Sequence, residues 1–314
     1  MHTQWIGTAA AVLMTILAAA GARAEPPQDV PQQARWYVHI DVQAMLQSAV
    51  GQRVLDRWEL DADSPKVREF EEDYGFNPLT DLHSVTMYGT TLEEGQGVVV
   101  LRGDFDREAL VRRMTRARNY EEVDLDGRAA HRFTIHRRGE DHRVLAVIRD
   151  EGEVVIASGQ PELRDALAVM EGEGEALGEG DPLLAPQPPG VFFQLGVVGL
   201  DTLEHRSAAM RSVRSAQLAA GQADGQAHIQ LRTQTRDAQT AAQMVELIEG
   251  LRALVALRHG PDAPITQAVQ TLTAKAEGDR VSADWSCDAN VLAQWMDRHG
   301  KAWHHHKHKQ QEDD

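Results

Sequence analysis

The chain has 314 residues, a formal net charge of −16, one cysteine and 5% aromatic residues. Its acidic balance argues against partners such as nucleic acids or anionic membranes, because both need a basic protein face. A single cysteine excludes an internal disulfide framework and any multi-cysteine zinc or iron–sulfur site. With 42% hydrophobic residues the chain can bury a core, and its length suits about two domains.

Residues 1–24 are predicted to be a signal peptide. The apolar run from Trp5 to Ala20 is shorter than the roughly 20 residues that a membrane-spanning helix needs. The segment 22–24 then matches the A-x-A pattern that precedes a signal-peptidase cut, here before Glu25. We therefore expect export to the periplasm or the extracellular space, with no transmembrane segment after cleavage. An uncleaved anchor is the alternative.

A flexible leader rich in Pro and Gln is predicted at 25–34, followed by a first α+β module at 35–172. Asp41 is placed to cap the first helix, because its carboxylate can accept that helix's free amide hydrogens. Glycine-containing turns join the later strands as hairpins. Strands are expected at 35–41, 83–89, 97–103, 119–124, 129–137, 142–149 and 153–158, and helices at 42–58, after Ser64-Pro65, from Asp106 and at 161–170.

An acidic linker rich in Gly and Pro is predicted at 173–189, and a second α+β module at 190–298. The strongest helix of the chain runs from Asp237 to about His259, with an apolar stripe of Met244, Leu247, Ile248, Leu251, Leu254 and Val255. Strands are expected at 191–197, 214–221 and 226–235 and a hairpin at 271–287, with further helices after Asp201, at 264–270 and at 288–298. Residues 299–314 form a His-rich tail that is predicted to be disordered.

The two halves present their elements in a similar order. Each opens with a strand, a capping Asp and a helix (39–46 and 198–205), and each closes with a hairpin and a helix (145–167 and 272–294). This order predicts two related α+β modules, produced by tandem duplication, of mostly antiparallel sheet with helices packed on one face. The alternative is two unrelated stretches, since this order of elements is common. Packing the halves together would cover an open face or edge of each sheet, and the crevice between them would be the default ligand site.

Metal-binding motifs are missing from the body of the chain, which has no H-E-x-x-H, C-x-x-C or EF-hand pattern. His131 and His136 lie an odd number of residues apart in a predicted strand, so their side chains should point to opposite faces. The tail offers the candidate metal ligands His304, His305, His306 and His308, which could bind Zn, Ni or Cu weakly. A solvated tail without a metal role is the alternative. No other cofactor is predicted.

Catalytic signatures are also missing, and no catalytic residue is predicted. Ser158 lacks the G-x-S-x-G context of a nucleophile elbow. Cys287 continues the apolar face of a predicted strand, which indicates a buried small hydrophobic residue. The glycines at 172 and 174 lack the third glycine of a phosphate loop and are flanked by acids. These absences favour a protein that is not an enzyme.

Three segments carry a resemblance to a known family. They are the HID of the first strand at 39–41, GFNPLTDLHSVTMYG at 75–89 and GVVVLRGDFDREAL at 97–110. With these segments the chain resembles a family of exported bacterial proteins best known from planctomycete-type genomes, over most of residues 35–298. That family has no assigned activity or catalytic residues, so the resemblance implies export and a fold but no function.

We therefore expect an exported, non-enzymatic binding or assembly module of the cell envelope, whose partner is an unidentified envelope protein or ligand and not a nucleic acid. One alternative is weak transition-metal binding through the His-rich tail. The other is a hydrolase whose carboxylates line the cleft between the modules.

Overall fold

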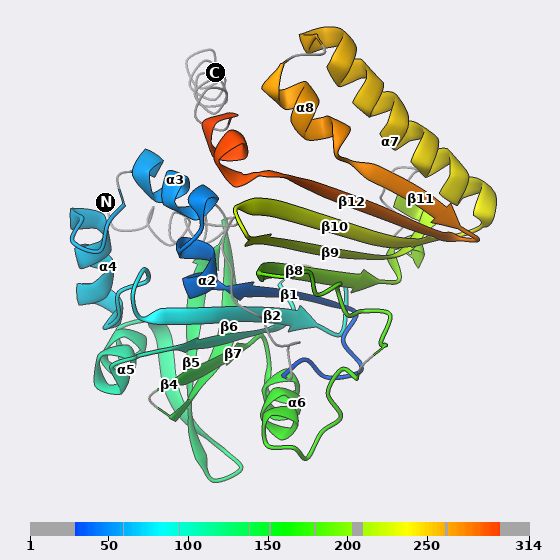
Figure 1. Cartoon of the computed structure of the whole chain (residues 1–314). Coiled ribbons are helices and arrows are strands. Elements are labelled where there is room, and N and C mark those ends of the chain that lie inside the picture. The colour runs from blue at the N-terminus through cyan, green and yellow to red at the C-terminus, as the bar shows by residue number, and fades with distance from the viewer. Residues whose placement is uncertain are drawn as a thin grey trace, which may run out of the picture.

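A computed structural model describes residues 29–295 except 59, 94, 138, 151, 179, 203–209 and 261–262. Its centre is a 12-stranded sheet in which every neighbouring pair is antiparallel (Figure 1). The α+β class and the antiparallel sheet are thus confirmed. The strands are β1 (Trp36–Asp41), β2 (Leu82–Gly89), β3 (Val98–Gly103), β4 (Arg118–Leu125), β5 (Arg128–Arg137), β6 (Glu140–Asp150), β7 (Glu153–Ala157), β8 (Val191–Val198), β9 (Val213–Ala223), β10 (Gln226–Thr235), β11 (Thr273–Glu277) and β12 (Arg280–Asp288).

Aspartates cap several of the helices. Asp41 accepts a 2.7 Å hydrogen bond from the amide of Ala44, as the sequence predicted. The predicted helix at 42–58 is divided in two, because the hydroxyl of Ser48 accepts a hydrogen bond from the amide of Gly51 and a new helix starts there. The helices are α2 (Val42–Leu46), α3 (Ala49–Trp58), α4 (Pro65–Tyr74), α5 (Arg107–Thr115), α6 (Gln160–Met170), α7 (Ala238–His259) and α8 (Pro264–Gln270), with short 3-10 turns at Leu200–Thr202 and Met210–Ser212 and a last helical stretch from residue 289.

The sheet runs without a break across the two halves of the chain. Its order is β11-β12-β10-β9-β8-β1-β2-β3-β7-β6-β5-β4, so β1 and β8 are the strands that join the halves. Their pairing extends from Trp36 opposite Val197 to Ile40 opposite Phe193. The two halves therefore cover each other's edges instead of stacking face to face. The predicted module boundaries stay a prediction.

The two faces of the sheet are defined here by β1. Face A carries Val38 and Ile40, and face B carries Tyr37 and His39, because successive side chains alternate. Buried residues of α2, α3 and α5 join the face A core, and α7 and α8 lie over β11 and β12 on the same side (Figure 1). α6 packs on face B, where Leu163 is fully buried.

Two irregular segments complete the cover of face B. Residues 29–34 pair with 175–177, through hydrogen bonds such as that from the amide of Leu177 to the carbonyl of Val30 at 2.8 Å. Val30, Leu183 and Ala185 are buried in the core of this face. The described part of the predicted leader and much of the predicted linker thus lie packed on the sheet, because their few apolar residues fill its surface. The predicted signal peptide and the His-rich tail lie outside the described residues.

Candidate functional site

A row of apolar side chains crosses seven neighbouring strands on face A, from β10 to β7. The strand registers place each member opposite the next. All seven are partly exposed to solvent, although they lie in the middle of a large sheet. We call this row the apolar strip, and its members are Leu231, Leu218, Leu195, Val38, Met87, Val99 and Ile156.

The neighbouring row on face B shows that this exposure belongs to one face only. This row crosses β1, β2, β3, β7 and β6, and each of its side chains is buried. Its members, each opposite the next, are Tyr37, Tyr88, Val98, Ala157 and Leu145. In Figure 1, α2 and α3 stand at the end of β1 while α7 and α8 lie over β11 and β12. The last helical stretch from residue 289 stands between these two groups, and its Leu292 packs against the face A core. Val38, Met87, Val99 and Ile156 of the strip also pack against this core but keep part of their surface exposed.

A second exposed apolar surface lies on α7. Leu247, Leu251, Leu254 and Leu257 are between 54% and 83% exposed, whereas Ala241 is the buried residue of the helix. The sequence grouped the first three of these leucines with Met244, Ile248 and Val255, which are only half-buried. The helix is apolar around much of its circumference, and β10, β11, β12 and α8 cover only one side of it. We call these four residues the leucine stripe.

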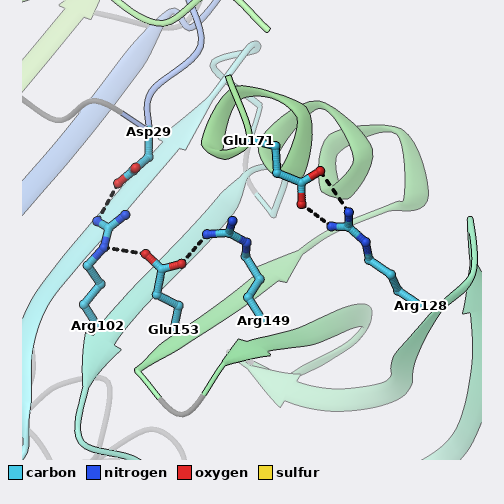
Figure 2. A network of polar contacts seen from close by, with 6 residues as sticks. All are labelled: Asp29, Arg102, Arg128, Arg149, Glu153 and Glu171. Atoms are coloured by element: carbon cyan, nitrogen blue, oxygen red, sulfur yellow. Dashed lines mark hydrogen bonds and ion pairs between the residues drawn. The ribbon is translucent and has the colours of Figure 1, made fainter. Parts of the chain in front are cut away.

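Ion pairs fasten the cover of face B (Figure 2). Arg102 of β3 contacts Asp29 at 2.5 Å and Glu153 of β7 at 2.8 Å, and Glu153 also pairs with Arg149. The side chains of Asp29 and Glu153 are only 11% and 18% exposed, so these contacts are better shielded from water than surface ion pairs. A separate pair, Arg128 with Glu171, holds the end of α6 through two hydrogen bonds (Figure 2). These ion pairs tie the segment at Asp29 and the end of α6 to the strands, and both lie on face B.

Buried polar side chains of β1, β2 and β8 lie beside this network. The Nδ1 atom of His39 is 2.8 Å from the hydroxyl of Thr86, and Tyr37 donates to Gln194 at 3.3 Å. Burial and the nearby charge of Arg102 lower the pKa of His39 to about 4, so its ring is neutral. Burial raises the pKa of Tyr37 to about 12. Because Thr86 is fully buried, a substrate cannot reach this hydroxyl–imidazole pair as a nucleophile.

The remaining sequence candidates are separated in space. His131 lies 3.1 Å from the hydroxyl of Tyr120, whereas His136 lies 2.8 Å from Asp141. The described residues contain no group of three or more His, Cys, Asp or Glu side chains that could hold a metal ion. Metal binding by His304, His305, His306 and His308 stays a prediction, because these residues lie outside the described part of the chain.

Cys287 is buried, as predicted, and burial raises the pKa of its thiol to about 11. It is therefore a poor nucleophile near neutral pH. The hydrolase alternative needs a cleft between the modules, but β1 and β8 meet there as hydrogen-bonded neighbours. No described helix is long and apolar enough to cross a membrane.

The apolar strip was not predicted from the sequence, although one signal pointed to it. Residues 98–101 read Val-Val-Val-Leu, which is apolar on both faces of the strand. Strands of this kind are buried on both sides, whereas half-exposed strands alternate apolar and polar residues. Within this run Val98 and Val100 on face B are buried, whereas Val99 and Leu101 on face A stay partly exposed.

No protein-family profile and no curated protein matches the chain. Several solved structures are similar to it, among them three crystal forms of the protein TP0453. Form III is 10% identical with a TM-score of 0.46, over 86% of this chain and 97% of that chain. Form IV is 11% identical with a TM-score of 0.45, over 87% and 96%. Form I is 13% identical with a TM-score of 0.43, again over 87% and 96%.

Proposed function

We propose that this chain is an exported, non-enzymatic binding module of the cell envelope, and that its partner binds on the apolar strip. The observation that carries the proposal is the partial exposure of seven apolar side chains across the middle of the sheet. Large contiguous apolar surfaces mark interaction sites, since leaving them in water costs about 25 cal/mol per Å².

The chemistry of the strip favours an amphipathic helix as partner. Its side chains carry no charge, and the backbone groups beneath them are already used in the sheet ladders. A polar ligand would find little to bind there. Helices are the usual cover of such a face, and α2, α3 and α5 already cover its neighbouring part.

The polar groups on face B support a structural role instead of a catalytic one. His39 and Thr86 are buried beneath the cover of that face, and Arg102 is held by two carboxylates. Perturbed pKa values alone mark a candidate site, but chemistry also requires access for a substrate.

Export and duplication belong to the same proposal. Export rests on the apolar run before residue 20 and the A-x-A pattern at 22–24. Duplication is supported by the strand order, because β1-β2-β3-β7-β6 in one half has the same relative order as β8-β9-β10-β12-β11 in the other. On this basis the second module lacks counterparts of β4 and β5.

The test compares two single changes in β10 whose side chains lie on opposite faces. Leu231→Glu puts a charge on the apolar strip, and Gln230→Glu puts the same charge on face B as a matched control. We expect the wild-type chain in an envelope fraction to migrate as a complex on native gels. Leu231→Glu should release the free chain, and Gln230→Glu should not. Equal migration of all three chains, or release by both variants, would overturn the proposal.

A further inference from the structure

The same chain contains a sheet face that the described helices leave partly exposed, and a helix, α7, whose outer side is exposed. The apolar strip is partly exposed from Leu231 to Ile156, and the leucine stripe of α7 has no described neighbour over its outer side. Both surfaces expose aliphatic side chains to water, which is unfavourable for each of them alone.

The length of α7 can be compared with the width of the apolar strip. α7 has 22 residues, so at 1.5 Å per residue it is about 33 Å long. Seven adjacent strands spaced about 4.8 Å apart span about 29 Å from the first to the last. One α7 helix is therefore long enough to lie across the strip from β10 to β7, and its leucine stripe, from Leu247 to Leu257, would contact about 15 Å of that width.

The charges favour a protein over a lipid surface as the partner of α7. The helix carries Glu246, Glu249, Arg252 and Arg258, two acids and two bases, and Arg252 is already paired with Glu249 at 2.6 Å. Helices that lie on anionic membranes have a polar face rich in Lys and Arg, which α7 lacks. On a chain with a net charge of −16, this uncharged stripe and the uncharged strip are also places where a second acidic copy is not repelled.

We propose that the partner on the apolar strip is α7 of a second copy of this chain, with the leucine stripe against the strip. This inference rests on the proposed function and names its partner. A two-fold axis lets each copy supply one helix and one strip, so that both surfaces are covered in a closed pair.

The test measures the oligomeric state of the full chain, purified as the cell produces it, by sedimentation at increasing protein concentration. It compares two variants, each of which damages one of the two proposed contact surfaces. Leu231→Glu damages the strip and leaves α7 intact, whereas the double change Leu251→Glu with Leu254→Glu damages the stripe and leaves the strip intact. Gln230→Glu and Ala242→Glu are the controls; Ala242 is exposed near the start of α7 and lies about 60° or more around the helix from every leucine of the stripe. Circular dichroism checks that every variant folds.

We expect the wild-type chain and both controls to sediment as dimers. Each damaged variant alone should associate at least tenfold more weakly, about the effect of 1.4 kcal/mol. An equimolar mixture of the two damaged variants should recover a 1:1 dimer, because the intact α7 of one meets the intact strip of the other.

Three outcomes would overturn the inference. If the strip variant alone still dimerises, the contact does not use the strip; if the α7 variant alone dimerises, it does not use the stripe. A wild-type chain that stays monomeric throughout also refutes a second copy as partner. If the wild-type chain is monomeric but forms an envelope complex that Leu231→Glu disrupts, the proposed binding function still holds, and its partner is a different molecule.

Discussion

Replacing His39 should change how the stability of the protein depends on pH. His39 is 9% exposed, bonded to Thr86, and close to the positive charge of Arg102 and the negative charge of Asp29. Its pKa falls from 6.5 to about 4 in the folded chain, mainly because burial disfavours the charged ring. The neutral imidazole is therefore the form that the fold accommodates.

The sign and size of the effect follow from proton linkage. Below pH 6.5 the unfolded chain takes up a proton at this histidine that the folded chain does not, so acid favours unfolding. Above pH 6.5 neither state is protonated and His39 adds no pH dependence. As the pH is lowered from 6.5 to about 4, the free energy of unfolding should fall by about 1.4 kcal/mol per pH unit, or roughly 3 kcal/mol in total.

The assay is urea unfolding of the wild-type chain and of His39→Gln from about pH 7.5 down to about pH 4.5. Glutamine does not titrate and is close to histidine in size. Carboxylates titrate in both proteins, so the difference between the two curves isolates His39. We expect the wild type to lose stability more steeply than the variant below pH 6.5. Parallel curves would refute the claim that His39 is buried in its neutral form.

Three further changes test other parts of the structure. Arg102→Met removes the guanidinium shared by two shielded carboxylates and should lower the free energy of unfolding by about 2 kcal/mol, measured with urea; an unchanged midpoint would contradict the network of Figure 2. Gly196→Ala would place a Cβ atom 1.9 Å from the carbonyl oxygen of Leu183, in the segment that packs on face B, so proteases should cut that segment faster. The control is Gly178→Ala, which has open space around it, and equal cleavage of the two variants would refute the packing of this segment on the sheet. Cys287 should react with thiol reagents near pH 8 only as fast as the chain unfolds, and rapid labelling would disprove its burial.

Local elements could be predicted because their signals lie close together in the sequence. The strand at Gln226–Thr235 follows an Asp-Gly turn, and α7 lies between the cap Asp237 and the stop at Gly260. Cys287 was placed in the core because it continues an apolar strand face. In each case neighbouring residues alone decide the conformation.

The candidate site depends on pairings that neighbouring residues do not decide. Val38 and Leu195 meet because β1 pairs with β8 across more than 150 residues of chain, and Val99 meets Ile156 because β3 pairs with β7. The apolar residues of α7 could be counted, but not which of them β11, β12 and α8 would cover. A partly uncovered strip is a property of the assembled sheet, so it became visible only with the strand order.

Photocrosslinking from the apolar strip tests the central claim most directly. A photoreactive residue in place of Leu218 of β9 would lie in the strip, one strand in from its β10 end, and digestion with mass spectrometry would identify the peptide it captures. We predict an adduct with residues 238–259 of a second copy, and none when the same group replaces Gln230 on the opposite face. Capture of a different region of the chain, or no adduct at Leu218, would contradict the account.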